Sequence, residues 1–480
     1  MRSVGNGVAA FRQTGGDISK YRWLNTYVSA DYSFLDKYFI SFNGAVDGSS
    51  RFGKNVPDAL HISGNSFAVM PSLAAAWLIS SENFLANNKA IDLLRLRASY
   101  GMSGNDDIGN FTAQQYYIAQ NFLGTQGLVR GGFGNDELQW ESVHKANLGL
   151  DAALFNERLN ITLDAYRNMT YKMLVDEALP TVAGINHALT NTGTMKTVGA
   201  EASVNGRVIN RSSLKWDLGF TISRYKSTIN RLPDPWSIVT EYADGYILSS
   251  LNKTPNLFYG YKTNGVYSSD AEAAADGLKI IQSTGQPIAF KGGDVRFVDV
   301  NGDKIINSSD RQIIGDPNPD FFGSVSTSLT WQRFTLDAFF TFTKGNDIYN
   351  YTRRQLESVS NFNNQTTAVL NRWKTNGQVT SIPRAVYGDP VGNSSFSDRW
   401  IEDGSYFRLR SATLSYNLPI QTNFLRYSVL YVTGNNLFTL TKYLGFDPEM
   451  SGTISPLGQG VDITLEPQYR SVQVGVRFGL

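Results

Sequence analysis

The sequence predicts an all-β protein, an antiparallel transmembrane β-barrel, and three observations support this fold class. Side chains alternate between apolar and polar along much of the chain, which is the period of a strand with two different faces. The alternating runs are about 9 to 13 residues long, the length that a tilted strand needs to cross a bilayer. Short breaks and long polar connections are found between the runs, as at the two ends of outer-membrane barrels.

The alternation is clear in LRLRASY, where Leu94, Leu96 and Tyr100 share one face and Arg95 and Arg97 share the other. An arginine on the lipid face at the bilayer midplane costs about 2–4 kcal/mol, so we expect both arginines to point into the lumen. About 14 to 16 strands of this kind fit the sequence. Further clear runs occupy residues 28–34, 146–152, 336–342 and 472–480.

The connections between the predicted strands have two lengths, and no interdomain linker separates them, so we expect a single domain over 1–480. The short breaks lie at 35–37, 155–158, 210–213 and 332–333. The long polar connections lie at about 48–64, 101–110, 172–195, 227–320 and 345–403. Within the longest of these, SDAEAAADG at 269–277 predicts one or two helical turns.

Two local signals refine the strand pattern. The apolar phase slips between Leu409 and Ala412, which predicts a β-bulge near Ser411. The final run, residues 472–480, alternates regularly and has Phe478 and Leu480 among its last apolar residues. It resembles the terminal signal of outer-membrane proteins and supplies a strand that could pair at a sheet edge.

Composition excludes several classes of protein. The formal net charge of +1 gives no electrostatic case for binding nucleic acid, and the absence of cysteine excludes disulfides and thiolate metal sites. No apolar run is long enough for a transmembrane helix, and the first residues have no apolar core of signal-peptide length. We therefore expect either a cytosolic protein or a chain whose original N-terminus is missing.

Motifs for nucleotide binding and catalysis are weak. The segment GSSRFGKN at 48–55 nearly matches a phosphate loop, but Asn55 replaces the required hydroxyl and Pro57 disfavours the helix that should follow. The three histidines, His61, His144 and His187, lie in unrelated segments, and the nucleophile motifs are missing. We predict no enzyme activity.

One acidic segment, DVNGDKIINSSD at 299–310, has oxygen-bearing residues at the ligand positions of a twelve-residue calcium loop. Lys304 stands where a calcium loop has glycine, and extended or rigid segments flank the loop instead of helices. No cofactor is required by the sequence; a structural Ca²⁺ is one interpretation, and a turn held by its own Asx hydrogen bonds is the other. The predicted ligands are Asp299, Asn301, Asp303, the Ile305 carbonyl, Asn307 and Asp310.

A family resemblance covers the chain almost from end to end. The segments that carry it include residues 36–53, 93–111, 139–170, 294–322 and 431–449, in this order. In these segments the chain resembles the SusC/RagA-type TonB-dependent transporters of Bacteroidetes outer membranes. Lys304 departs from the acidic pattern D-x-N-G-D-G usual in that family.

The resemblance implies that the chain is the C-terminal part of a barrel of roughly 22 strands with a plugged lumen. It implies nutrient uptake, usually of oligosaccharide and sometimes of peptide, with a SusD-like surface lipoprotein as a lid and TonB as the energy source. Because family members are about twice this length, we expect the plug, the TonB-contacting segment and the first strands to be absent. Alone, the chain is expected neither to close a barrel nor to couple to TonB.

Within this interpretation, the loops at 227–320 and 345–403 should line the mouth and meet the lid. Their aromatic side chains could stack on sugars, form interface belts or pack within the loops. Two rival classes are a soluble or surface-attached glycan-binding adhesin module and a secreted β-rich glycan hydrolase. The aromatic candidates are Trp236, Tyr242, Tyr246, Phe258, Tyr259, Tyr261, Tyr349 and Tyr351.

Overall fold

A computed structural model describes residues 20–479, apart from short internal gaps. The gaps are 123–124, 181, 183, 185–186, 234–236, 283–284, 421–424, 450–451, 453–457 and 465. Leu480 and Trp236, which the sequence singled out, lie outside the described residues. No helix in the described part of the chain is long and apolar enough to cross a membrane.

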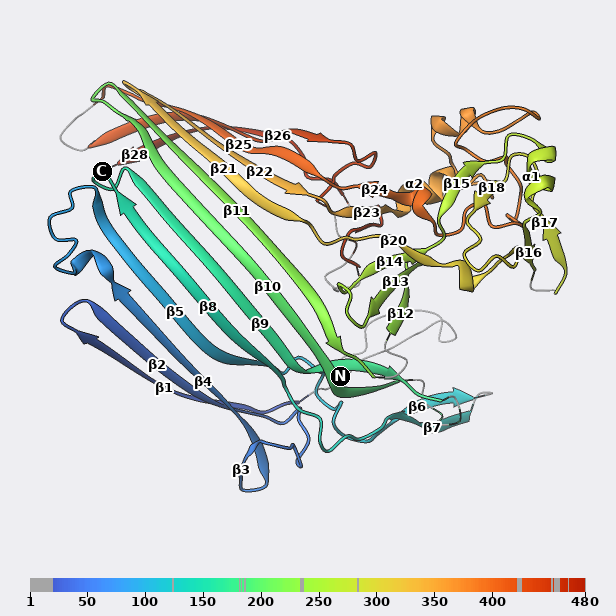
Figure 1. The fold of residues 1–480 in the computed structure, drawn as a ribbon, viewed down its shortest axis with the longest axis horizontal. Coiled ribbons are helices and arrows are strands. Elements are labelled where there is room, and N and C mark those ends of the chain that lie inside the picture. The colour runs from blue at the N-terminus through green and yellow to red at the C-terminus, as the bar shows by residue number, and fades with distance from the viewer. Residues whose placement is uncertain are drawn as a thin grey trace, which may run out of the picture.

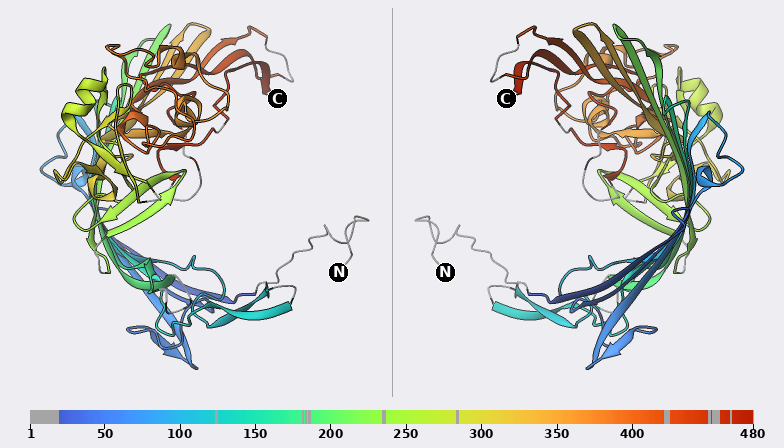
Figure 2. Two further views of the ribbon diagram at one scale, coloured as in Figure 1. Left: turned by 90° about the vertical axis from the view of Figure 1, so that its right-hand side faces the viewer. Right: turned by 90° about the vertical axis from the view of Figure 1, so that its left-hand side faces the viewer.

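A 14-stranded sheet forms the body of the molecule, and its strands pair antiparallel in the order β1-β2-β4-β5-β8-β9-β10-β11-β21-β22-β25-β26-β28, with β3 beside β4. It curves into an open arc with β1 and β28 at its edges (Figures 1 and 2). The strands are β1 Trp23–Phe34, β2 Tyr38–Ser49, β3 Leu60–Ile62, β4 Asn65–Leu78, β5 Ile91–Asn105, β8 Glu141–Leu154, β9 Leu159–Ala178, β10 His187–Asn210, β11 Leu214–Arg231, β21 Phe321–Trp331, β22 Phe334–Lys344, β25 Tyr406–Asn417, β26 Tyr427–Thr441 and β28 Ser471–Gly479.

The two faces of the arc differ as the alternation predicted. Arg95 and Arg97 lie on one face, where Arg97 Nε is 2.7 Å from Asp151 Oδ2 and Arg97 Nη2 is 3.2 Å from Asp164. Leu96 pairs with Leu150 on the opposite face. We call the face with the ion pairs the inner face and the leucine-bearing one the outer face, because membrane barrels are polar inside and apolar outside.

Aromatic side chains mark the short-turn end of the outer face. Tyr38 stacks on Trp77 with ring centroids 6.4 Å apart, and Phe334 lies 4.7 Å from Tyr416. Trp331 stacks beside Phe334 across the hairpin turn. Tyrosine and tryptophan are enriched where a barrel wall meets the membrane–water interface, so this end of the sheet carries one aromatic girdle.

The predicted bulge is present in β25. Its register shifts between Leu409 and Ser411 against β26, and at the same place against β22. Against β22, Arg410 is the extra residue, directly before the predicted position. Against β26, the extra residue lies in β26, between Asn435 and Phe438. The bulge lets apolar residues remain on the outer face on both sides of it, which explains the phase slip in the sequence.

The connections follow the predicted asymmetry, with one difference. Three-residue and four-residue turns join β1 to β2 and β8 to β9, while the connections at the opposite end are long. The segment 172–195, which we expected to be a loop, is largely strand, because β9 and β10 continue as a paired hairpin well beyond the bilayer-spanning length. Register shifts near Gly193 accompany this extension.

The long connections contain their own secondary structure. Ser269 caps helix α1 by accepting a hydrogen bond from the Glu272 N–H, and Gly277 ends it at φ +70°, which confirms the short helix expected there. The elements are β6 Tyr116–Phe122, β7 Thr125–Gly132, β12 Ser237–Tyr242, β13 Gly245–Ser250, β14 Leu257–Gly260, β15 Thr263–Val266, α1 Asp270–Asp276, β16 Lys279–Ile281, β17 Pro287–Ala289, β18 Val295–Phe297, β19 Ile305–Ile306, β20 Gln312–Gly315, β23 Asp347–Asn350, α2 Tyr351–Glu357, β24 Ile401–Asp403 and β27 Val461–Asp462.

The face assignment makes a prediction for two neighbouring residues of β8. Leu148 is 55% exposed on the outer face, whereas Asn147 lies on the inner face. Leu148→Arg should lower the free energy of unfolding in lipid vesicles by about 2–4 kcal/mol, because it places a charge against lipid. Asn147→Arg should change it by less than about 1 kcal/mol. Urea titration of the folded, membrane-inserted protein measures both, and equal effects would contradict the assignment.

Candidate functional site

The long connections between β11 and β21 and between β22 and β25 fold together at one end of the sheet (Figure 1). We call this unit, residues 237–315 and 347–403 with β27, the loop assembly. One of its cores surrounds Tyr267, Phe290 and Phe297. The second joins both long connections and β27, and consists of Phe258, Tyr349, Phe396, Trp400 and Val461.

These cores account for most of the aromatic residues proposed as sugar platforms. Phe258 and Tyr349 are each 1% exposed. Tyr242, Tyr246 and Tyr351 pack against the second core, and Tyr261 packs against the first. The structure therefore favours loop packing among the three roles that the sequence left open for these residues. Tyr259, in β14, is partly exposed.

Burial also changes the acid–base properties of this core. It raises the pKa of the Tyr349 hydroxyl, which donates a hydrogen bond of 2.9 Å to the Ala243 carbonyl and so stays protonated. Burial, with a smaller contribution from Arg353, lowers the pKa of Arg399 to about 10. Both groups keep their usual protonation state at neutral pH, so neither acts as a general base or a nucleophile.

The acidic segment at 299–310 forms a tight, internally hydrogen-bonded turn. Asp299 accepts bonds from the Gly302 and Lys304 N–H groups at 2.7 and 2.9 Å. Asp303 Oδ1 accepts one from the Ile305 N–H at 2.7 Å. Asp310, which is fully buried, accepts from Val300 and Asn307. Asn301 and Asn307 accept similar bonds from Asp303 and Ser309.

The backbone of this turn has the shape of a calcium loop at its sixth position. Lys304 has φ +65°, the left-handed conformation that favours glycine. The carboxylates nevertheless do not gather: no group of three or more acidic or histidine side chains suited to a metal occurs in the described ranges. Its hydrogen bonds match the Asx-turn interpretation, and Ca²⁺ binding stays a prediction.

The inner face is a polar wall lined by ion pairs. Arg95 and Arg97 both bind Asp151, and Arg97 also binds Asp164. The Arg97 guanidinium crosses Gly149, where a β-carbon would lie only 2.6 Å from it. Nearer the short turns, a polar hollow of about 500 Å³ contains the Arg207–Asp217 ion pair. Such a wall presents charged and polar groups that can hydrogen-bond with a polar solute.

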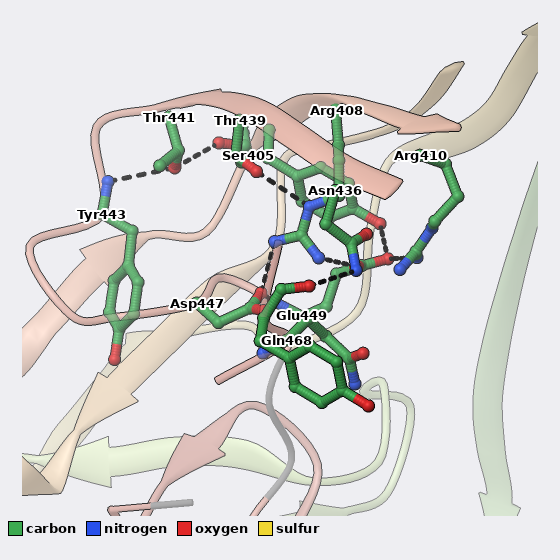
Figure 3. A network of polar contacts seen from close by, with 12 residues as sticks. Ser405, Arg408, Arg410, Asn436, Thr439, Thr441, Tyr443, Asp447, Glu449 and Gln468 are labelled. Atoms are coloured by element: carbon green, nitrogen blue, oxygen red, sulfur yellow. Dashed lines mark hydrogen bonds and ion pairs between the residues drawn. The ribbon is translucent and has the colours of Figure 1, made fainter. Parts of the chain in front are cut away.

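A second ionic network connects β25 to the chain that follows β26 (Figure 3). The Arg408 guanidinium lies between Asp447, at 2.5 Å, and Glu449, and its Nε donates to Thr439 at 2.9 Å. Arg410, the bulge residue, also contacts Glu449. The side chains of Arg408 and Asp447 are each only 3% exposed. The network therefore fixes the segment around 447–449 to the wall.

Sequence reasoning missed one exposed feature of the loop assembly. Phe362 and Tyr387 are 91% and 74% exposed, and their rings lie 5.0 Å apart. Backbone hydrogen bonds from Val386 to Val359 and from Gly388 to Ser360 hold the two segments together. Their separation of 25 positions gives no sequence signal, because neither residue belongs to a periodic pattern.

A family model described as "TonB dependent receptor-like, beta-barrel" matches residues 2–437. The chain belongs to the TonB-dependent receptor β-barrel family. The assignment confirms the predicted fold class, the SusC/RagA-like resemblance, the outer-membrane location and the expectation that the chain is not an enzyme. The described residues of this receptor chain contain no plug domain.

Several receptors are similar to this chain. TonB-dependent receptor P3 of Formosa agariphila is 32% identical over 98% of the chain and 47% of its own length. TonB-dependent receptor SusC of Bacteroides thetaiotaomicron is 28% identical over 90% and 42%. The solved RagAB peptide transporter superposes with a TM-score of 0.79 at 24% identity, over 95% of this chain and 47% of that one. The receptor chain thus spans about half the length of the curated relatives it matches.

The Arg408 network gives a testable pair of variants. Arg408→Met leaves the buried Asp447 carboxylate without its cation and should lower the free energy of unfolding by about 3–5 kcal/mol. Arg410→Met removes a cation that is 34% exposed, so its cost should stay below about 1 kcal/mol. Thermal unfolding in detergent compares the two. Similar shifts would mean that Arg408 is not the residue that anchors the 447–449 segment.

Proposed function

We propose that this chain forms part of the wall and the extracellular mouth of a receptor that imports a nutrient, an oligosaccharide, across the outer membrane with energy from TonB. We propose further that residues 1–480 act as one C-terminal barrel portion, and that other strands of the same receptor complete the arc. The observation that carries the proposal is the loop assembly at one end of a polar-faced membrane sheet. Peptide is the second candidate cargo, supported by the likeness to the RagAB peptide transporter.

Uptake by cells tests the cargo. Disruption of the chromosomal gene should abolish uptake of a labelled oligosaccharide from a panel of glycan fragments, and loss of TonB should have the same effect. Labelled peptides of similar mass form the parallel arm. Uptake of peptide alone would replace the oligosaccharide proposal with the second candidate, and unchanged uptake of both would contradict the transport function.

We also propose that a SusD-like surface lipoprotein docks on the loop assembly through Phe362 and Tyr387. Aromatic residues dominate the energy of protein interfaces, and this pair is exposed and held in place by backbone hydrogen bonds. The pair belongs to the connection between β22 and β25 and not to the strands of the inner face, so docking there uses none of the inner-face residues.

Docking is tested by the amount of SusD-like lipoprotein that co-purifies with the tagged receptor from outer membranes, quantified by mass spectrometry. The double variant Phe362→Ala/Tyr387→Ala should reduce recovery about tenfold or more, because it removes two exposed aromatic anchors. Val379→Ala is the matched control, since Val379 is 89% exposed but has no aromatic partner. Equal recovery from both variants would place the docking surface elsewhere.

For the turn at 299–310 we propose a structural role in bracing the loop assembly, with Ca²⁺ as its predicted ligand. A chelator should then increase protease cleavage near the turn while the sheet stays folded. Lys304→Gly should relieve about 1 kcal/mol of backbone strain and make cleavage more dependent on Ca²⁺, because it restores the usual glycine of a calcium loop. If chelator does not change cleavage in either protein, Ca²⁺ binding is contradicted and the interpretation as a hydrogen-bonded turn stands.

A further inference from the structure

Four basic side chains lie on the outer, lipid-facing side of three adjacent strands. On β11 the outward positions are apolar from Leu214 to Ile222, and Arg224 and Lys226 come next. On β10 the outward-facing apolar residues give way to Lys196. On β9 Arg167 interrupts the outward-facing apolar residues. On each strand the basic residue stands toward the end that carries the long connections, where the apolar band of a barrel gives way to headgroups.

The strand register brings these four residues together. Val198 of β10 pairs with Arg167 on one side and with Lys226 on the other. Arg224 is two positions from Lys226 and therefore points the same way, while Lys196 is two positions from Val198. The four form one patch, which we call the basic patch.

The basic patch has no acidic counterpart on its own face. Among the ion pairs of the described residues, none includes a member of the patch, and Arg167, whose guanidinium contacts the Met169 sulfur, is exposed, as are Arg224 and Lys226. The carboxylates of the same strands, Asp164 and Glu201, alternate onto the inner face. Uncompensated cations are unfavourable in the bilayer core, whereas near its border their long side chains can reach the lipid headgroups.

A shallow apolar hollow of about 510 Å³ adjoins the patch on the outer face. The small side chains of Ala165, Ala200 and Ala202 form its floor, and Leu163 and Ile222 border it. Asp164 and Glu201, which alternate onto the inner face, also line it. Arg224 also lines this hollow, and it pairs in register with Ala200. The hollow therefore places apolar surface directly next to a guanidinium.

Aromatic residues flank the patch at the same level of the wall. The Tyr100 hydroxyl lies 2.7 Å from His144 Nδ1, and the His144 ring meets the Tyr171 ring edge to face at 4.9 Å. His144 pairs with Met169, whose other partner is Lys196. Tyrosines beside basic residues are typical of the membrane–water interface, which supports this depth for the patch.

We propose that the basic patch and the hollow together form a binding site for a membrane lipid with a phosphate-bearing headgroup. The phosphate accepts charge-assisted hydrogen bonds from Arg167, Arg224 and Lys226, and one acyl chain lies over the alanine floor. This site is separate from the cargo path, because it faces the opposite side of the sheet. It rests on the assignment of the outer face to lipid and not on the identity of the cargo.

Native mass spectrometry of the receptor, extracted from outer membranes in mild detergent and titrated with phosphatidic acid, tests the site. Arg167→Gln/Arg224→Gln/Lys226→Gln should weaken phosphatidic acid binding about tenfold or more, whereas Arg224→Lys should retain most of it. Lys145→Gln is the matched control, because Lys145 is exposed at the same level but lies on the inner face. Phosphatidylcholine, whose phosphate is covered by choline, should bind wild type and the triple variant equally.

An excess of inorganic phosphate separates a lipid site from a simple anion site. Failure of inorganic phosphate to displace phosphatidic acid supports the proposal, since the hollow contributes only to lipid. Displacement by inorganic phosphate, or equal lipid affinity of wild type and the triple variant, would overturn it. A triple variant that does not fold is replaced by the single variants Arg167→Gln and Arg224→Gln, which should each weaken binding more than Lys145→Gln does.

Discussion

The architecture depends on one constraint: the bilayer offers no water to backbone N–H and C=O groups, so each spanning strand must be paired on both sides. From β2 to β26, the strands of the main path have a hydrogen-bonded neighbour on each edge. The same pairing fixes the register, and the register decides which side chains face lipid. The polar ladder of Arg95, Arg97 and Asp151 on the inner face, and the leucines on the outer face, both follow from this single requirement.

This constraint does not apply to the loop assembly, whose fold is stabilised by other interactions. Its segments are held by hydrophobic cores and by buried polar contacts. Arg384 forms a bidentate ion pair with the fully buried Asp294, and Asn393 completes the contact. This pair joins the two long connections, which are about 90 residues apart at these positions. The two long connections therefore form one folded unit at one end of the sheet.

The wall was predictable from sequence, whereas the packing of the loop assembly was not. The wall is encoded by local signals: the period-two alternation, the short turns and the bulge beside Ser411. The structure contains each of these features. The aromatic core around Tyr349 depends on contacts with Phe258 and Phe396 in other segments, which no local pattern encodes. For the same reason, the sequence offered three roles for the loop aromatics and could not choose among them.

The acidic turn shows where local chemistry is ambiguous. Alternate aspartate and asparagine residues suit both a cation and a self-bonded turn, since the same oxygens accept either. The left-handed backbone at Lys304 fits the shape of a calcium loop, whereas the carboxylates of Asp299 and Asp310 are engaged with N–H groups. The sequence could locate this feature but could not determine its ligand.

The most direct test of the account is the orientation of β11 in the membrane. The sequence has no cysteine, so single cysteines at 220 to 223 can carry nitroxide labels without background. The account predicts that labels at Phe220 and Ile222 are relaxed by lipid-soluble oxygen, and that labels at Thr221 and Ser223 are not. Alternation with a period of two would confirm a membrane wall with one lipid face. Uniform accessibility to a water-soluble relaxant at all four positions would contradict it.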